Sequence, residues 1–507
     1  MVKGWRAKLT AIAALSFAFT GVLTHVSASA LTPAATSSAE STPNAVGLLA
    51  YNNATLDATT NLDRYDVVVI NAFQYDQIPM IRAANPNAII LVYKNIAATE
   101  TYDVVNGVDN PLLPTGVGWA WANANHPDWF LQDTNGNRVQ WADYSQRWWM
   151  DVGNPAYQNT WASNVISEAK QYGVNGVLLD DVDMSEAGHL PAGTTLAKYP
   201  TDSDYAAATQ SFLANVGPQL QNAGLLAVAN IAFPWTPNWE PAYKSWLGDV
   251  SGVMLEHWMK PGQDSSYARY GNGDWTYQMQ QAADVMDAGK MFLPLTYGDP
   301  GDTTTQEYAR ASFLMSWNGG NSSLLWVPDG TGINTWSSRW TTDLGLPAGP
   351  AQQLPSGVWE RRYAGGLVLV NPSTTASVSV DTGASYLTPS GASVTSVRLA
   401  PTTGAVLTSG GKPSGQSTTR KRSAGLVGKA LRSLSWRSIR TEFHRWAAHP
   451  SARHQPRWQW RRLRGYFFGW RHANQHARVS FYRWRRAHGL SGRRVLDRLL
   501  GRRFAAA

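Results

Sequence analysis

The sequence of 507 residues contains no cysteine. Disulfide bonds, thiolate metal ligands and a cysteine nucleophile are therefore excluded, and stability must come from packing. Beyond the N-terminal region there is no long apolar run, so no later segment is predicted to span a membrane. The zinc-protease pattern HExxH is missing, and His126 and His257 have no partner at ligand spacing. We therefore expect no metal and no cofactor.

Acidic residues are scarce at the C-terminal end. Residues 411–507 contain 24 Lys and Arg but only two acids, so this part carries +22 and the rest of the chain −14. Residues 410–419 are predicted to be a flexible linker, and 420–507 an Arg- and Trp-rich basic tail, partly an amphipathic helix. We expect this tail to bind an anionic cell-envelope polymer or a membrane surface, and no nucleic acid. A solvated basic extension is the alternative.

The N-terminal residues 1–30 have the three parts of a secretory signal. Three basic residues precede a mostly apolar run from Leu9 to Leu23, and small residues at 28–30 offer a cleavage site. The run is short for a membrane anchor. Residues 31–44 are small and polar and are predicted to be a linker. The sequence thus predicts a secreted, extracellular protein and allows its association with the cell envelope.

Eight short apolar runs recur between residues 45 and 345, with helical patterns between most of them. Several runs are continuously apolar, which is typical of parallel strands buried on both faces. Eightfold alternation of strand and helix predicts a (β/α)8 TIM barrel over 45–345. An open doubly wound sheet is the alternative, although no Gly-rich phosphate loop follows the first strand. The predicted strands are 45–51, 67–71, 89–95, 176–183, 226–231, 252–258, 291–298 and 322–327.

The pattern changes after the predicted barrel. Residues 346–409 contain short alternating strands separated by turn residues, which predicts a small antiparallel β-sandwich. Within the barrel, the link from Ile96 to Tyr157 is unusually long and contains six Trp. Long loops in compact domains usually carry function, so we interpret this link as one wall of a cleft.

The active site of such a barrel lies at the carboxyl ends of the strands, where we find carboxylates on the fourth and sixth. Asp180 follows Gly-Val-Leu-Leu, and Glu256 follows the matching frame Gly-Val-Met-Leu. Cleavage of a glycosidic bond needs two carboxyl groups flanking it, one as proton donor and one as nucleophile or base. We predict Asp180 as nucleophile or charge stabiliser and Glu256, beside aromatic residues, as acid/base. The alternative is that the acids cap a helix or bind a structural cation.

Other polar or aromatic residues at strand ends are predicted to bind substrate hydroxyls. Asp151 in the long link belongs to the same prediction, although each of these residues could equally be a polar residue of the barrel rim. The predicted substrate-binding residues are Tyr51, Lys94, Asp151, Asp181, Asn230, His257, Tyr297 and Trp326.

Three segments resemble a known group of bacterial barrels. They are HPDWFLQDTNGN (126–137), WWMDVGNPAYQ (148–158) and YGVNGVLLDDVD (172–183). The chain over about 45–407 is similar to the hypothetical glycosyl-hydrolase-like family fifteen, and in plan to dextranase and α-galactosidase barrels. The resemblance implies a barrel with a C-terminal β-sandwich, a nucleophile at Asp180 and an acid/base at Glu256. Glu rather than Asp at the sixth strand is nearer the dextranase pattern.

The predicted function is hydrolysis of O-glycosidic bonds in an extracellular or cell-wall polysaccharide by two carboxylates, with retention of configuration. The alternative is a non-catalytic carbohydrate-binding barrel that its basic tail targets to the cell envelope. The distance between the two carboxyl groups distinguishes the two outcomes, since about 5 Å is typical of retention and about 6.5–9.5 Å of inversion.

Overall fold

Most of the chain between residues 45 and 410 is described by the computed structural model. The described residues are 45–50, 56, 61–185, 189–232, 239–262, 266–299, 301–328 and 344–410. The predicted signal, the linker 31–44 and the basic tail lie outside these residues. None of the described helices is both long and apolar enough to cross a membrane.

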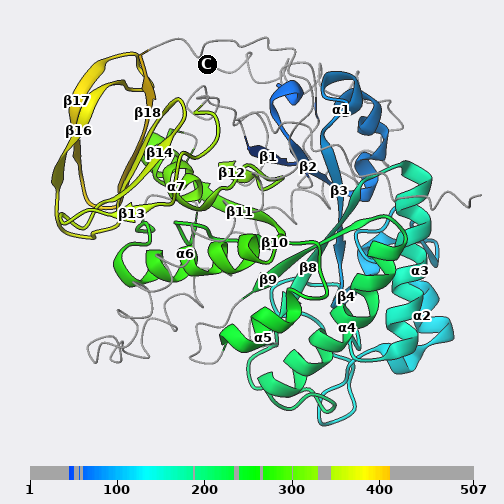
Figure 1. The fold of residues 1–507 in the computed structure, drawn as a ribbon. Coiled ribbons are helices and arrows are strands. Elements are labelled where there is room, and N and C mark those ends of the chain that lie inside the picture. The colour runs from blue at the N-terminus through cyan, green and yellow to red at the C-terminus, as the bar shows by residue number, and fades with distance from the viewer. Residues whose placement is uncertain are drawn as a thin grey trace, which may run out of the picture. The chain divides into compact units, whose positions relative to one another are not determined.

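Eight parallel strands close into a barrel, which confirms the predicted architecture and excludes the open sheet (Figure 1). In the barrel the order is β1-β12-β11-β10-β9-β8-β3-β2, so each strand pairs with the previous and next barrel strand of the sequence. The strands are β1 (Val46–Leu49), β2 (Val67–Ile70), β3 (Ile89–Asn95), β8 (Gly176–Asp183), β9 (Leu226–Ala232), β10 (Gly252–Leu255), β11 (Met291–Gly298) and β12 (Leu324–Pro328).

Two of the barrel glycines show why the matching frames of β8 and β10 begin with Gly. A Cβ at Gly176 would lie 2.4 Å from the carbonyl oxygen of Leu226, and one at Gly252 would lie 2.7 Å from that of Met291. No side chain fits there, because the neighbouring strand passes too close. Each frame thus places a glycine at the tight start of a strand and its acid at the open end.

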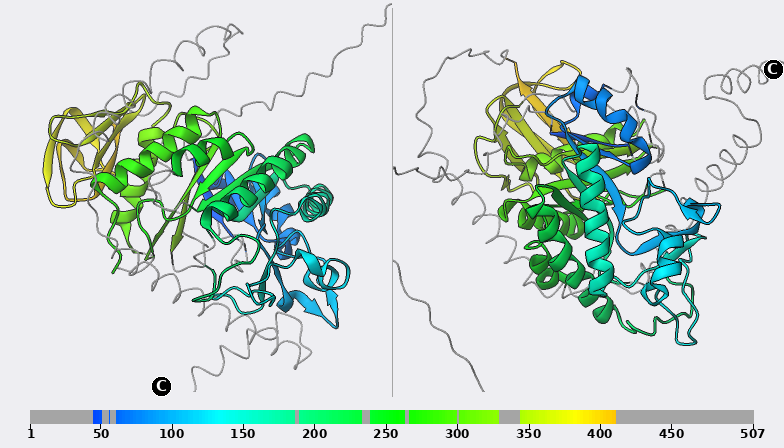
Figure 2. Two further views of the ribbon diagram at one scale, coloured as in Figure 1. Left: turned by 90° about the horizontal axis from the view of Figure 1, so that it is seen from below. Right: turned by 90° about the vertical axis from the view of Figure 1, so that its right-hand side faces the viewer.

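Alternation along each strand separates two apolar cores. Inward side chains such as Leu91, Leu178 and Leu293 fill the barrel, whereas their neighbours in sequence pack in the helical layer. The helices are α1 (Ile78–Ala84), α3 (Pro155–Tyr172), α4 (Asp202–Asn222), α5 (Trp239–Trp246), α6 (Asn272–Asp287) and α7 (Thr303–Ser316). Figure 2 shows α3 and α4 side by side along the outside of the strands.

The long link between β3 and β8 folds into small elements whose aromatic side chains join the core outside the barrel strands. Trp129, Trp141 and Trp149 are buried in it, whereas Trp121 is exposed. Three of its six Trp rings are therefore part of the core and do not present a surface. The elements are β4 (Ala98–Glu100), β5 (Val104–Val105), β6 (Val108–Asp109), α2 (Trp119–Asn125) and β7 (Arg147–Trp149).

A separate antiparallel sheet of six strands follows the barrel, in the order β13-β14-β15-β18-β16-β17. All six strands belong to one hydrogen-bonded sheet, and side chains of β15, β16, β17 and β18 share one apolar core, so the antiparallel sheet predicted for this region is present. A register shift in β16 between Asp381 and Tyr386 lets this strand pair with both β17 and β18, which keeps the sheet in one piece. The strands are β13 (Gln352–Gln353), β14 (Trp359–Tyr363), β15 (Gly366–Asn371), β16 (Val378–Leu387), β17 (Ser393–Leu399) and β18 (Thr403–Ser409).

The sheet packs against α7 of the barrel. Arg361 on β14 donates hydrogen bonds to the carbonyl oxygens of Leu314 and Trp317, at 2.8 and 2.6 Å, and Tyr363 donates to that of Leu314 at 2.5 Å. These carbonyls lie at the C-terminal end of α7, where backbone acceptors lack helical partners. The sheet thus caps a barrel helix and covers its flank.

Candidate active site

Two carboxylates and one amide meet at the carboxyl ends of β8, β9 and β10. The amide nitrogen Nδ2 of Asn230 donates to Oδ1 of Asp180 at 2.8 Å and to Oε2 of Glu256 at 2.9 Å. Because one nitrogen is bonded to both oxygens, those oxygens lie no more than about 5.7 Å apart. The three side chains point inward because each lies two residues after an inward-facing residue of its strand.

Aromatic side chains of the barrel hold both carboxylates. The Tyr297 hydroxyl at the end of β11 donates to Oε1 of Glu256 at 2.6 Å. The Nε2 atom of His257 lies 3.7 Å from the same oxygen, and its ring lies 5.2 Å from that of Tyr297. On the other side, the Tyr93 hydroxyl of β3 donates to Asp180. Both acids are therefore oriented from neighbouring strands.

Asp180 has an unusual affinity for a proton. Burial raises its pKa, and so do the negative charges of Asp181 and Glu256, while hydrogen bonds from Asn230 and Tyr93 oppose them; the result is a pKa of about 6. The pair of Asp180 and Glu256 therefore holds a proton into a pH range where an ordinary aspartate is fully ionised. Such a pair has the protonation that acid and nucleophile need together.

The next residue, Asp181, is turned away from its neighbour by the backbone. The pairing of β8 with β9 shifts register between Leu179 and Val182, and Asp181 has a φ of 57°, which is rare outside glycine. This bulge directs the Asp181 carboxylate to the side chain of Asn95, whose amide donates to Oδ2. Two consecutive acids thus lie in different surroundings.

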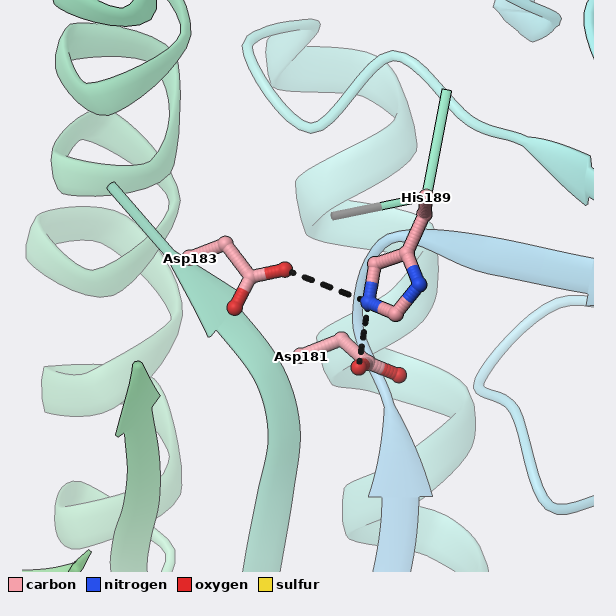
Figure 3. A group of neighbouring side chains, drawn as sticks. All are labelled: Asp181, Asp183 and His189. Carbon is pink, nitrogen blue, oxygen red and sulfur yellow. Dashed lines mark ion pairs between the residues drawn. The ribbon is translucent and has the colours of Figure 1, made fainter. Parts of the chain in front are cut away.

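His189 lies beside Asp181, between three carboxylates. Its Nδ1 atom is 3.0 Å from Asp143, and its Nε2 atom is 3.5 Å from Asp181 and 3.7 Å from Asp183. Figure 3 shows the ring facing these last two carboxylates. The ring also stacks on Trp141, with 4.1 Å between centroids. Burial alone would lower the pKa of His189, but hydrogen bonds to Asp143 and Asp181 raise it to about 10.

By spacing alone, this group could hold a cation. Asp181, Asp183 and His189 offer ligand atoms within 4.8 Å of one another. A proton on Nε2 of His189 would lie where that cation would bind, between the ring and these two carboxylates. The site therefore combines several carboxylates with one imidazole.

A match to a protein family identifies the class of enzyme. Residues 82–367 match the family described as hypothetical glycosyl hydrolase family 15, which is more than half of the chain. The protein belongs to this family. It is thus a glycoside hydrolase, as the sequence predicted, and it acts on a glycan. No curated protein matches it.

The chain is similar to several solved structures at low sequence identity. The glycoside hydrolase domain of PelA from Pseudomonas aeruginosa is 16% identical, with 57% of this chain and 96% of that chain covered and a TM-score of 0.38. Ega3 of Aspergillus fumigatus, in complex with galactosamine, is 14% identical, with 57% and 92% covered and a TM-score of 0.35. A maltogenic α-amylase, AmyB from Thermotoga neapolitana, is 10% identical, with 72% and 98% covered and a TM-score of 0.40.

Four of the residues predicted from this glycoside hydrolase's sequence to bind substrate lie apart from the dyad of Asp180 and Glu256. Lys94 points outward, where its Nζ atom is 2.7 Å from Glu168 of α3. Trp326 also points outward and is buried in the helical core. Asp151 is bound by Lys198 and Tyr199. Asp181 belongs to the His189 group, and Tyr51 lies outside the described residues.

Lys94 and Trp326 were predicted as site residues because they end their strands. The alternation of side chains between the two faces of a strand corrects this prediction. Lys94 follows the inward-facing Tyr93, and Trp326 follows the inward-facing Leu325, so both face the helices. Their placement does not support contact with a substrate in the barrel mouth.

Four residues of the site were missed. Tyr93 and Asn95 could have been found by alternation, because they share the inward face of β3 with Leu91. Asp143 and His189 had no such signal. They come from irregular segments, and only the folded chain brings them to Asp181.

Proposed function

We propose that this glycoside hydrolase cleaves the bonds of an extracellular or cell-wall polysaccharide with retention of configuration. In this proposal Asp180 is the acid/base and Glu256 the nucleophile. The observation that carries the proposal is the single amide of Asn230, which binds one oxygen of each carboxylate.

The short distance between the carboxylates supports retention. An inverting enzyme needs a water molecule between its base and the sugar, so its carboxyl groups lie about 6.5–9.5 Å apart. The oxygens bridged by Asn230 lie within about 5.7 Å of each other, a bound that includes the spacing of about 5–5.5 Å of retaining enzymes. A nucleophile must reach the anomeric carbon directly, and this spacing allows it.

The surroundings of the two acids support a division of roles opposite to the one that the sequence suggested. Asp180 has a pKa raised to about 6 by burial and by its charged neighbours, which suits a proton donor. Glu256 receives hydrogen bonds from Tyr297 and Asn230, which stabilise a charged carboxylate. A charged Glu256 is the form that attacks.

The reaction then has two steps. An oxygen of Glu256 attacks the anomeric carbon and forms an ester, while Asp180 gives its proton to the leaving oxygen. Asp180 next takes a proton from a water molecule, whose oxygen attacks the same carbon and releases Glu256. We assign orientation of Glu256 to Tyr297 and His257, and orientation of both carboxylates to Asn230.

A glycan-panel hydrolysis screen identifies the substrate, and azide then tests the roles. In Glu256→Ala, azide should enter from the side of the missing carboxylate and give a glycosyl azide of inverted configuration. In Asp180→Ala, azide should attack the ester and give the retained configuration. Asp128→Asn, which changes an exposed carboxylate, is the control.

Each outcome of the azide test has a separate meaning. Exchange of the two configurations would reverse the roles of Asp180 and Glu256. Absence of azide products from both variants would contradict a covalent intermediate. Glycan binding without hydrolysis by the unchanged protein would favour the carbohydrate-binding alternative.

We further propose that the enzyme is secreted and that residues 420–507 attach it to an anionic envelope surface. Opposite net charges, +22 for residues 411–507 and −14 for the rest, support this. Each basic residue near anionic lipid contributes about 1 kcal/mol, and salt screens the attraction. Full-length protein should cosediment with anionic vesicles or cell walls at low salt, and protein 1–410 should not. Equal binding of both would contradict the proposal.

A further inference from the structure

The turn that follows β10 brings two consecutive side chains together. Side chains of a strand alternate between its faces, so the residue after the inward-facing Glu256 should point away from it. His257 instead has a φ of 63°, in the left-handed region, and its Nε2 atom lies 3.7 Å from Oε1 of Glu256. Met259 has a φ of 60°. Residues other than glycine rarely adopt this conformation, so two of them in one turn need support from their surroundings.

One side chain of α6 bonds to both of these residues. The Nε2 atom of Gln278 donates to the carbonyl oxygen of His257 at 3.0 Å, and its Oε1 atom accepts from the backbone N–H of Met259 at 2.8 Å. A side-chain amide has a donor and an acceptor side by side, as this pair of backbone groups requires. Gln278 is 3% exposed, so water cannot replace these bonds. Gln278 therefore spans the turn from its first left-handed residue to its second.

We propose that Gln278 is a positioning residue of the reaction, which acts through this turn and places the His257 ring against Glu256. Without the two bonds, the turn relaxes toward a more common backbone conformation and the ring moves away from the nucleophile. The inference rests on the proposed function, because it takes Glu256 as the attacking carboxylate.

Trp258, between the two left-handed residues, attaches the turn to the barrel. Its backbone N–H donates to the carbonyl oxygen of Leu295 on β11 at 2.7 Å, and its Nε1 atom donates to that of Ala309 on α7 at 3.3 Å. The Trp258 ring is fully buried. These bonds keep the turn on the barrel when Gln278 is replaced, but they do not fix the backbone of His257.

The place of the His257 ring matters because it borders the proposed nucleophile. The ring lies 5.2 Å from that of Tyr297, whose hydroxyl donates to Oε1 of Glu256 at 2.6 Å. Two rings thus lie beside the same carboxylate oxygen. A nucleophile must be aligned with the anomeric carbon, and a displacement of about 1 Å can lower the rate about 100-fold. A residue that fixes this ring should therefore affect kcat more than KM.

Kinetics on the glycan from the screen test this expectation. Gln278→Met keeps the length of the side chain and removes both bonds, so kcat should fall roughly 10- to 100-fold while KM changes by less than about threefold. Gln281→Met is the matched control. Gln281 lies on the same helix, is 1% exposed, and its Nε2 atom has no hydrogen-bond partner among the described residues.

Two kinetic outcomes would overturn the proposal. The first is an unchanged kcat per folded molecule in Gln278→Met with only a lower melting temperature, which would make Gln278 merely structural. The second is an equal fall of kcat in Gln281→Met, because the loss would then follow from any change in the buried face of α6.

Variants of His257 test the path from Gln278 to Glu256. His257→Asn removes the ring and keeps a residue that tolerates the left-handed conformation. It should lower kcat about as much as Gln278→Met, and the two substitutions together should lower it no further. Full kcat in His257→Asn would overturn the proposal, even if Gln278→Met does not fold. So would a further fall in the double variant, because Gln278 would then act by another path.

The position of the ring can also be followed without a substrate. In NMR spectra of full-length protein with ¹³C-labelled histidine, the signal of His257 is the one that His257→Asn removes. Gln278→Met should shift this signal, because the ring moves relative to that of Tyr297, and Gln281→Met should leave it in place. An unmoved signal in Gln278→Met would overturn the proposal. Full activity of Glu256→Gln would instead overturn the proposed function, while the shift would still show that Gln278 places His257.

Discussion

The two sides of the barrel strands use ionisable residues in opposite ways. On the outside, the fully buried Lys94 forms an ion pair with Glu168 of α3, so the two charges are opposite. On the inside, Asp180 and Glu256 have the same sign and share the neutral amide of Asn230. The outer ion pair stabilises the fold, whereas the two inner carboxylates repel each other. Such a repulsion costs stability and is expected where a proton must be held ready for transfer.

The largest effect that this comparison predicts is on turnover by inner-side variants. Asp180→Asn and Glu256→Gln should each lower kcat/KM by roughly 10³-fold or more, because each removes the proton donor or the nucleophile. The melting temperature should stay near that of the unchanged protein or rise, because the repulsion is gone. Kinetics on the substrate from the screen and calorimetry measure the two quantities. Activity close to normal in either variant would remove that residue from the dyad.

An outer-side variant should show the reverse. Lys94→Ala leaves Glu168 without its cation, although the Tyr75 hydroxyl still donates to it at 2.8 Å, and should cost about 3–5 kcal/mol of unfolding free energy, the range for breaking a buried ion pair. The kcat/KM of the protein that remains folded should change little, since Lys94 faces α3. Denaturant unfolding and active-site titration provide the measurements. If Lys94→Ala loses turnover at unchanged stability, Lys94 acts in the reaction and the comparison fails.

The sequence predicts the strands and the residues on each face of a strand, but it does not predict contacts made by irregular segments. The strand runs and the frame Gly-Val-x-Leu-acid predict the barrel, and they place Asp180 and Glu256 at two ends where the structure joins them. The alternation of side chains along β3 then places Tyr93 inside the barrel and Lys94 outside it. The contact of His189 with Asp181 follows no period, because it depends on the path of the loop after β8.

The C-terminal region shows the same limit. Short alternating runs predict its strands, but they do not determine in which order the strands pair. The order depends on a register shift in β16 between Asp381 and Tyr386, a stretch that includes Gly383 with a φ of 70°.

A smaller effect is expected for an inner residue that orients the nucleophile. Tyr297→Phe removes the hydroxyl that donates to Glu256 at 2.6 Å. Hydrogen bonds to charged groups contribute about 1.5–3 kcal/mol, so kcat/KM should fall by roughly 10- to 100-fold. The fall should be in kcat, with little change in stability. A drop in stability without a drop in kcat would place Tyr297 among the residues that only support the fold.

The smallest effect is expected at Trp326, which ends a strand like Tyr297 but faces the other way. Its ring is buried in the helical core, close enough that a Cβ on Gly298 would lie 2.3 Å from it. Trp326→Phe keeps an aromatic ring but leaves a small cavity, so it should cost about 1–2 kcal/mol of stability. Glycan hydrolysis should be unchanged, because the side chain is buried in the core on the opposite side of the strands from the dyad. Isothermal unfolding and kcat/KM on one preparation test both statements. A change in KM for the glycan would show that this strand end reaches the substrate, and the division between the two sides would have to be redrawn at β12.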